Sequence, residues 1–204
     1  MNICIDTNIF FSFQKGICIG ESPLEVINIL TKVASTGQLS FYMPPRVSEE
    51  FIFMADQNIQ EAISKFLSKI NVQSPSIQTQ QIGAQTLYDF VAESRLRSSQ
   101  GLHVAEEILV QVARTCNTTN LPNRVDFEKS LQQPKEALRS RYRNATRTGF
   151  VDSLADLDLI FLAKETGSCL VSADEGVITW GRKLGVKEMG LEVFGQTIRQ
   201  IVVE

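Results

Sequence analysis

The chain has 204 residues, of which 43% are hydrophobic and 21% are charged, and its formal net charge is −3. No apolar run approaches the ~18 residues that a membrane-spanning helix needs, so the composition excludes a membrane protein. It is typical of one globular domain, or of one domain that carries a large insertion, and the chain is long enough to bury a core of its own.

Residues 1–56 alternate between short apolar strands and helices. The expected strands are residues 1–5 (MNICI) and 39–45 (LSFYMPP), and the expected helices are residues 22–36 and 47–55. The first helix begins at a Ser-Pro pair and ends at Gly37, which are common signals for a helix entry and stop. The first strand ends at Asp6, and Glu50 lies in the first turns of the second helix.

Residues 59–147 have a different character and are rich in glutamine, serine and charged residues. Their apolar residues recur at spacings of three and four, which is typical of helices. We expect a helical hairpin here, inserted into the domain, with a loop around residues 117–124. Pro134 is expected to break the chain before a last helix over residues 135–146.

Residues 153–189 return to the alternation of helices and strands. The expected elements are helices over 153–165 and 177–184, strands over 168–172 and 186–189, and a turn at 174–176. Gly167 is the expected stop of the first of these helices. Strands that alternate with helices predict a parallel sheet, so the sequence predicts an α/β fold.

Four aspartates are the strongest candidates for a catalytic site: Asp6, Asp152, Asp156 and Asp174. Asp6 and Asp174 follow expected strands, and sites in open parallel sheets lie beyond the carboxyl ends of the strands. Asp152 and Asp156 are four residues apart, so we expect them to be neighbours on one helix face, where like charges repel unless a cation lies between them. Asp158 is about 200° around that helix from Asp156 and is a weaker candidate.

Each of these acids also has a purely structural interpretation. Ser153 and Asp156 resemble a capping box. Asp6 suits a cap on the turn that follows it, and Asp174 suits a turn before a glycine. Glu50 is a further weak candidate, because the helix dipole alone also stabilises an acid in the first turns. For a single aspartate the two interpretations are equally reasonable, and for all four together the structural one is weaker.

Cysteine and histidine usage excludes a different kind of metal site. The cysteines are scattered without a CxxC motif (Cys4, Cys18, Cys116 and Cys169), and His103 is the one histidine. A thiolate or imidazole site is therefore excluded, whereas clustered carboxylates favour Mg²⁺, with Mn²⁺ as the alternative. Such ions promote phosphodiester cleavage. Reduced cysteines and an N-terminus without a basic signal region favour the cytoplasm.

An arginine-rich segment precedes the second pair of aspartates. A net charge of −3 argues against a nucleic-acid partner, but an average hides segregated charge. Arginines that contact phosphates, with an aromatic ring for base stacking, suit an RNA substrate. The alternative is an ordinary solvated helix face. The candidate RNA-binding residues are Arg139, Arg141, Tyr142, Arg143 and Arg147, with Arg95 and Arg97 extending the surface.

Several strings of the sequence resemble known nucleases. ICIDTNIFF, which begins at Ile3, resembles the first strand of PIN-domain nucleases, and LVSADEG resembles their last acidic strand end. The long string over residues 139–186 is more distinctive. It resembles the HARP family of small protein-only RNase P enzymes, the homologues of the Aquifex RNase P. ESRLRSSQGLHVAEE, at residues 93–107, is similar to the helical region of that family.

This resemblance implies a fold and an activity. It implies a PIN-like three-layer α/β/α nuclease domain with a central parallel sheet, formed by residues 1–56 and 146–204. Residues 57–145 would be a helical insertion that binds RNA and joins two copies into a homodimer, which assembles further. The implied activity is endonucleolytic removal of the 5′ leader from precursor tRNA, leaving a 5′-phosphate on the mature tRNA. The family's acidic positions fall on Asp6, Asp152, Asp156 and Asp174, with Asp158 as a further candidate.

Two other functions remain open from the sequence. One is a toxin-type PIN ribonuclease that cuts mature tRNA or rRNA, although such enzymes are usually shorter and lack a long helical insertion. The other is a non-catalytic RNA-binding protein with a PIN-like fold. The four aspartates argue against it, because an idle site has no use for clustered negative charge.

Overall fold

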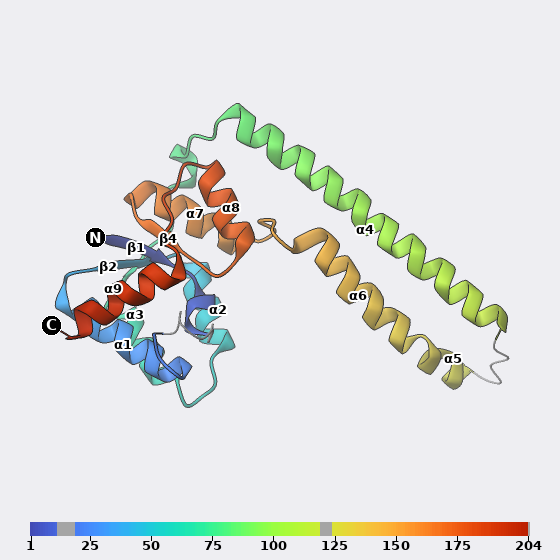
Figure 1. Cartoon of the computed structure of the whole chain (residues 1–204), viewed down its shortest axis with the longest axis horizontal. Helices are drawn as coiled ribbons and strands as arrows, with labels where there is room; N and C mark the ends of the chain where they lie inside the picture. The colour runs from blue at the N-terminus through green and yellow to red at the C-terminus, as the bar shows by residue number, and fades with distance from the viewer. Residues whose placement is uncertain (12–18, 119–123, 204) are drawn as a thin grey trace. The chain divides into compact units, whose positions relative to one another are not determined.

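The computed structural model describes residues 1–11, 19–118 and 124–203 (Figure 1). The chain divides into two compact units. The first is formed by Met1–Ile82 together with Gly149–Glu204, and the second by Gly83–Thr148. We call them the nuclease unit and the helical unit. No helix in the described part of the chain is long and apolar enough to cross a membrane.

The centre of the nuclease unit is a parallel sheet of four strands in the order β3-β2-β1-β4. The strands are β1 (Asn2–Ile5), β2 (Ser40–Met43), β3 (Asn71–Val72) and β4 (Cys169–Val171). Ile3 is in register with Phe41 on one side and with Cys169 on the other. The α/β fold with a parallel sheet is therefore confirmed, because β1 is buried between two parallel neighbours.

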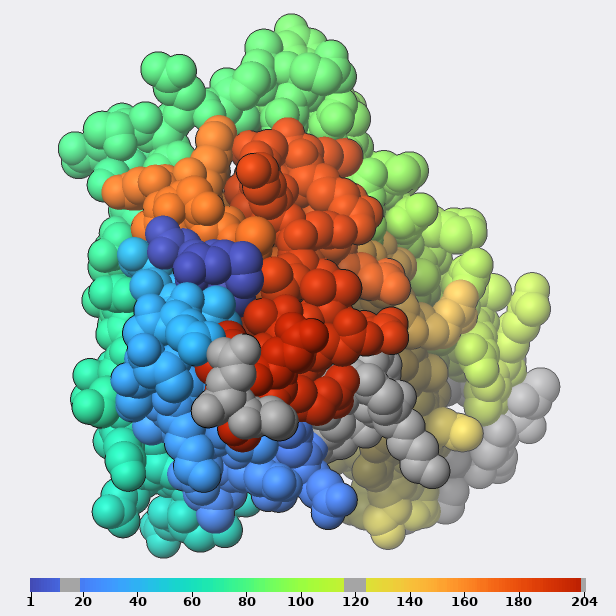
Figure 2. Space-filling model, turned by 60° about the vertical axis from the view of Figure 1, so that its left-hand side comes forward, coloured from blue at the N-terminus to red at the C-terminus, as the bar shows by residue number. Residues whose placement is uncertain are grey.

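Helices cover the sheet on both sides. The helices of this unit are η1 (Thr7–Phe10), α1 (Pro23–Thr36), α2 (Pro45–Met54), α3 (Gln60–Leu67), η2 (Ile77–Thr79), α7 (Leu154–Thr166), α8 (Glu175–Lys183) and α9 (Leu191–Val203). Figure 1 shows α7 and α8 on one side of the sheet and α1, α3 and α9 on the other. Figure 2 shows α9, in red, beside the blue residues of α1, with which it packs.

Two of the helices begin and end where the sequence indicates. Ser22 caps α1 by accepting a hydrogen bond from the Glu25 backbone N–H, and Gly37 ends the helix in the left-handed region at φ 74°. Ser153 caps α7, and Gly167 ends it at φ 61°. A residue with a side chain is strained at such φ values, which is why glycine terminates both helices.

Two local expectations are wrong. Residues 186–189 form a single parallel bridge between Leu170 and Glu188 instead of a strand. The expected turn at 174–176 is the start of α8, with Asp174 as its cap. Strand β3 and helix α9 were also not expected from the sequence. β3 has only two residues, both exposed, so it shows no apolar pattern.

The helical unit consists of α4 (Ala84–Thr118), α5 (Arg124–Ser130) and α6 (Gln132–Arg147). Helices α4 and α6 pack together as the expected hairpin, and the Tyr142 ring lies so close to Gly101 that a Cβ there would be 2.8 Å from it. Pro134 lies inside the first turn of α6 instead of before it, because a first-turn residue needs no backbone donor. The unit begins at Gly83, not at residue 57, since α3 and β3 belong to the nuclease unit.

Candidate active site

Asp6 and Asp174 meet at one edge of the sheet. Asp6 directly follows β1, and Asp174 lies just beyond β4, the neighbouring strand. The Asp6 backbone N–H donates to the Val171 carbonyl at 3.1 Å, which extends the pairing of the two strands to the residue that bears the acid. Parallel neighbours end at the same edge, and this is the edge at which α/β proteins bind ligands.

The Asp6 carboxylate is buried and held by three side chains. Its Oδ2 accepts hydrogen bonds from Ser172 Oγ at 2.6 Å and from Asn8 Nδ2 at 2.7 Å, and its Oδ1 accepts one from Thr7 Oγ1 at 3.3 Å. Burial raises the pKa of Asp6, and the negative charge of Asp174 raises it further, against the hydrogen bonds from Ser172 and Thr7. Asp6 is thus fixed in place, but its charge is not neutralised by any of these contacts.

Ser172 and Asn8 tie the two strand ends together. Besides donating to Asp6, the Ser172 hydroxyl accepts a hydrogen bond from the Asp174 backbone N–H at 2.9 Å. Asn8 Oδ1 accepts one from the Ala173 backbone N–H at 2.9 Å. Neither residue was a candidate from the sequence. The available signal was their place inside the strings ICIDTNIFF and LVSADEG, next to the acids that they position.

Asp174 has a structural and an electrostatic role together. Its Oδ1 caps α8 by accepting hydrogen bonds from the backbone N–H groups of Gly176 at 2.6 Å and Val177 at 3.3 Å. Its Oδ2 has no hydrogen-bond donor among the residues that the structure describes. The cap therefore fixes the carboxylate and leaves one oxygen available for a ligand.

The helix-face argument for Asp152 and Asp156 is wrong. Helix α7 begins at Leu154 with Ser153 as its cap, so Asp152 precedes the helix and only Asp156 lies in its first turn. The capping interpretation of Ser153 is correct, because its Oγ accepts a hydrogen bond from the Asp156 backbone N–H at 3.0 Å. The two acids are nevertheless close, since the charge of Asp152 raises the pKa of Asp156.

The charges of the other three aspartates all affect the pKa of Asp156. Burial is the largest cause that raises its pKa, which reaches about 6, and the charges of Asp6, Asp174 and Asp152 add to it. A hydrogen bond with Ser153 opposes the shift. The structure therefore brings together the four aspartates that the sequence singled out, from both ends of the chain. We call them the aspartate cluster.

The two weaker candidates differ in their surroundings. Partial burial and the charge of Asp6 raise the pKa of Glu50, which places Glu50 beside the aspartate cluster. Asp158 is buried, and its Oδ2 forms an ion pair with Arg46 Nη1 at 3.3 Å. Asp158 thus links α7 to α2, and its charge is not among the causes that shift the pKa of Asp6 or Asp156.

Comparison with known proteins decides the family. The chain matches the family described as PINc domain ribonuclease over residues 2–203. It is 31% identical to the RNA-free ribonuclease P of Thermococcus kodakarensis, over 99% of this chain and 96% of the relative. It is 34% identical to the RNA-free ribonuclease P of Alkalilimnicola ehrlichii, over 97% of this chain and 95% of the relative. The chain belongs to the RNA-free ribonuclease P family. The expected family, the PIN-like fold and the endoribonuclease class are thereby confirmed.

An RNA-free ribonuclease P built on a PIN domain is expected to use a divalent metal ion, as PIN nucleases generally do. Within the described residues no three acids, cysteines or histidines converge tightly enough to form a ready-made metal site. The donor set still fits a hydrated cation, because Mg²⁺ keeps several waters and needs only one or two carboxylates. Burial is the main cause that raises the pKa of Asp156, and the repulsion from Asp6, Asp174 and Asp152 that adds to it is what a bound cation would relieve.

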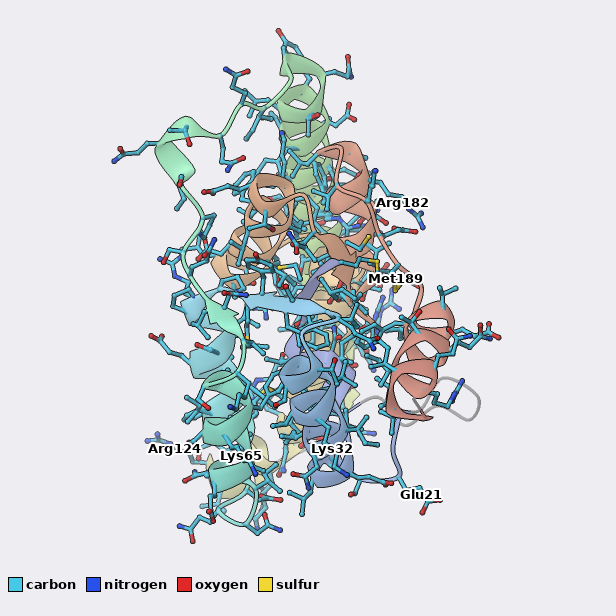
Figure 3. The ribbon with its side chains drawn as sticks, turned by 90° about the vertical axis from the view of Figure 1, so that its left-hand side faces the viewer. Glu21, Lys32, Lys65, Arg124, Arg182 and Met189 are labelled. Atoms are coloured by element: carbon cyan, nitrogen blue, oxygen red, sulfur yellow. The ribbon has the colours of Figure 1, made fainter. Side chains whose placement is uncertain are left out.

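A pocket adjoins the aspartate cluster at Asp174. Its lining includes Asp174, Thr179 and Arg182 of α8 and Leu191 of α9. Arg182, labelled in Figure 3, directs two guanidinium nitrogens to the carboxylate of Glu188. The pocket therefore joins the acidic edge of the sheet to a surface that carries a paired cation.

The expected RNA-binding residues all lie in the helical unit. Arg141 pairs with Glu107, and Arg97 donates to Glu93 and to the Thr148 carbonyl. Arg95 and Tyr142 line one pocket on α4 and α6. Arg139 and Arg143 have no ion-pair partner within the described part of the chain. Arg147 ends α6.

Two further residues have ordinary surface or packing roles. His103 is exposed and pairs with Glu107 at 3.2 Å, so it is a surface histidine. Trp180 is buried against Phe150, with ring centroids 5.6 Å apart. Among the cysteines, Cys4 is buried and free and Cys169 is half-buried and free, whereas Cys18 and the side chain of Cys116 lie outside the described residues.

Proposed function

We propose that this RNA-free ribonuclease P removes the 5′ leader of precursor tRNA and leaves a 5′-phosphate on the mature tRNA. The name of the relatives supports ribonuclease P activity, since relatives that cover nearly the whole chain carry it. The observation that carries the proposal for this chain is the meeting of Asp6 and Asp174 at adjoining strand ends, where Ser172 bonds to both, with Asp156 near enough for their charges to act on it.

Mg²⁺ is the proposed cofactor, with Mn²⁺ as a substitute, and Asp6, Asp152, Asp156 and Asp174 are its proposed ligands. Asp158 and Glu50 are weaker candidates. When bound, the ion supplies an activated water and stabilises the 3′ oxygen of the leader as it leaves. The protein positions the acids: Ser172 and Asn8 hold Asp6, and the α8 cap holds the Asp174 carboxylate by one oxygen.

Asp156 has the pKa of a group that changes charge near neutral pH. With a pKa of about 6, it is mostly ionised at pH 7.5 and close enough to neutrality to exchange a proton. It is therefore suited either to bind the cation or to accept a proton from the attacking water. Both roles require the ionised form. The pKa of about 6 belongs to the metal-free site, so protons compete with the cation there, and the Mg²⁺ concentration needed for cleavage is expected to rise as pH falls through 6.

The helical unit is proposed to bind the tRNA and to join subunits. The arginines of α4 and α6, with Tyr142, suit contacts to phosphates and bases. Helix α4 also exposes apolar side chains to solvent, among them Leu87, Tyr88 and Val91, which line one groove. An exposed apolar stripe of this kind supports a homodimer formed through the unit and a higher homo-oligomer built from such dimers. The proposed location is the cytoplasm.

A cleavage assay with mapped ends tests the activity. Purified protein is incubated with precursor tRNA and Mg²⁺, and the products are sized and their 5′ ends identified. The proposal predicts an intact leader and a mature tRNA that bears a 5′-phosphate. Mature tRNA is the control substrate, because a toxin-type nuclease would cut it. Cutting of mature tRNA, or binding of the precursor without turnover in Mg²⁺, would overturn the proposal.

A further inference from the structure

Phe53 is an aromatic side chain that the fold leaves in water. It is 91% exposed on α2, and Met54 next to it is 60% exposed. Burial of apolar area drives folding, so a nearly naked phenyl ring contributes little to the stability of the chain by itself. The exposed ring and thioether lie side by side and are available for contact with another molecule.

Helix α2 is held beside the aspartate cluster by its buried face. The Phe51 ring stacks on Phe10, four residues after Asp6, with centroids 4.2 Å apart. Arg46 pairs with Asp158 of α7 at 3.3 Å. These two contacts fix α2 against the segment that follows Asp6 and against the helix that carries Asp156, and Glu50 lies close enough to feel the charge of Asp6.

Phe53 and Met54 lie on the same side of α2 as Glu50. They follow it by three and four residues, and side chains at those spacings are neighbours whose Cβ atoms are about 5–6 Å apart. Ile52, by contrast, is two residues from Glu50 and therefore about 200° around the helix. Phe53 is therefore a direct neighbour of Glu50 on the helix surface, and Glu50 lies near Asp6 of the aspartate cluster.

We propose that Phe53 stacks on the base of the last leader nucleotide and so binds the precursor with its leader beside the aspartate cluster. This inference rests on the proposed function. The first nucleotide of mature tRNA is paired in the acceptor stem, whereas the leader is single-stranded. Of the two nucleotides that flank the scissile phosphate, the leader nucleotide is therefore the one whose base is free to turn onto a protein ring. Stacking on an aromatic ring accepts any base, as leaders of varied sequence require.

The surroundings of Phe53 favour a base over other occupants. Glu49 and Glu50 are exposed on the same helix and repel a backbone phosphate, but they do not repel the uncharged face of a base. Two apolar side chains are also far smaller than the roughly 800 Å² per partner of a stable protein interface. A single planar base matches the exposed ring, and Met54 can border it as a polarisable side chain.

Steady-state cleavage of precursor tRNA tests the inference through the split between KM and kcat. Phe53→Ala should raise KM about ten-fold and leave kcat nearly unchanged, because the stacking of the base on an aromatic ring is removed. Phe53→Trp should retain the wild-type KM. Ile52→Ala is the matched control, since Ile52 is 45% exposed on the other side of the same helix, and its KM should not change.

A precursor that lacks the base of the last leader nucleotide identifies the partner of the ring. On this substrate the KM of the wild-type enzyme should rise as much as it does through Phe53→Ala on the ordinary precursor. The KM of the Phe53→Ala variant should not rise further on this substrate. The inference would be overturned if Phe53→Ala had the KM of wild type. It would also be overturned if the increases in KM from the variant and from the missing base multiplied when the two changes were combined. In both cases the proposed function stands. A changed oligomer mass in Phe53→Ala would assign the ring to a protein contact and also overturn it. Failure of the wild-type enzyme to cut precursor tRNA would remove both.

Discussion

Ser172 is a single hydroxyl on which the geometry of the acidic edge depends. It donates to Asp6 and accepts from the backbone N–H of Asp174, so it aligns two members of the aspartate cluster that come from opposite ends of the chain. Partners of metal-binding carboxylates orient their ligands and commonly change metal affinity by about 10–100-fold when removed. Ser172 is therefore expected to be a positioning residue.

Ser172→Ala should lower the affinity of the enzyme for Mg²⁺. Without the donated hydrogen bond the pKa of Asp6 rises further, since that bond opposes the effect of burial. We expect the Mg²⁺ concentration for half-maximal cleavage at pH 7.5 to increase by roughly ten-fold or more. Ser64→Ala, which removes an exposed hydroxyl bonded only within α3, is the control. An unchanged Mg²⁺ requirement in Ser172→Ala would contradict this role.

Asp156→Asn should stabilise the metal-free protein at neutral pH. The pKa of Asp156 is 3.8 in an unperturbed chain and about 6 in the fold, so the folded state binds more protons between these values. Stability from this group is present at low pH and is lost as pH rises through 6. In a chelator, the variant should melt at a higher temperature than wild type at pH 7.5, and the difference should shrink toward pH 4. A variant that melts lower at pH 7.5 would contradict the account.

Asp6 and Asp174 could be predicted from their positions after apolar strands, because an acid that follows such a strand lies at the edge of the sheet. Helical spacing failed for Asp152, since Ser153 starts α7 one residue after it. The distance between Asp152 and Asp156 is set by the helix entry, which sequence periodicity does not describe. Ser172 and Asn8 were hidden because short polar residues beside strands also suit turns.

The start of α8 packs closely on another part of the chain. A Cβ on Gly176 would lie 2.7 Å from the Phe150 carbonyl oxygen, and backbone atoms cannot give way as a flexible side chain can. This contact sets α8, capped by Asp174, against the segment that leads into Asp152. The close approach of two backbones therefore helps to assemble the cluster.

Gly176→Ala should destabilise the fold and displace the acids at either side of the contact. A loss of about 1–3 kcal/mol in the free energy of unfolding is expected from overpacking, together with slower cleavage. Denaturant unfolding measures the first effect. Gly190→Ala is the matched control, because nothing lies within 4 Å of a Cβ at that position. Equal free energies of unfolding in the two variants would show that the Phe150 backbone leaves room for a side chain at residue 176.

Elements with their own start and stop signals were predictable, and elements that depend on distant neighbours were not. Helices α1 and α7 have a serine cap and a glycine stop in the sequence itself. Strand β3 exists only because Asn71 and Val72 pair with β2. A two-residue exposed strand has no local pattern, and the pairing partner lies too far away in the chain to be inferred from propensity.

At the scale of the whole molecule, charge is divided between two units. The aspartate cluster belongs to the nuclease unit and the arginines of α4 and α6 to the helical unit, so a net charge of −3 describes neither. The sequence indicated both RNA binding and a metal site, because an arginine-rich segment directly precedes the second pair of aspartates. It did not locate the unit boundary, because the polar residues 57–82 resemble the insertion in composition although they fold with the sheet.

Arg139→Ala combined with Arg143→Ala should weaken the binding of precursor tRNA and reduce its salt dependence. Removing one contact between an arginine and a phosphate lowers the slope of log affinity against log salt by about one, so the double variant should lower it by about two. Lys32→Ala with Lys65→Ala is the control of equal charge, at two exposed positions of the nuclease unit labelled in Figure 3. The same salt slope in the arginine variant and in wild type would place these residues outside the RNA interface.

The most direct test of a metal-dependent aspartate cluster is the single-turnover rate of precursor-tRNA cleavage, measured against Mg²⁺ concentration. Wild type is compared with asparagine variants of Asp6, Asp152, Asp156 and Asp174, each checked for folding. We expect each variant to lose at least about 100-fold in rate and wild type to be inactive in a chelator. Glu61→Gln, which changes an exposed acid in the first turn of α3, is the control and should stay close to wild type. Full cleavage in the chelator, or a wild-type rate in any of the four variants, would contradict the account.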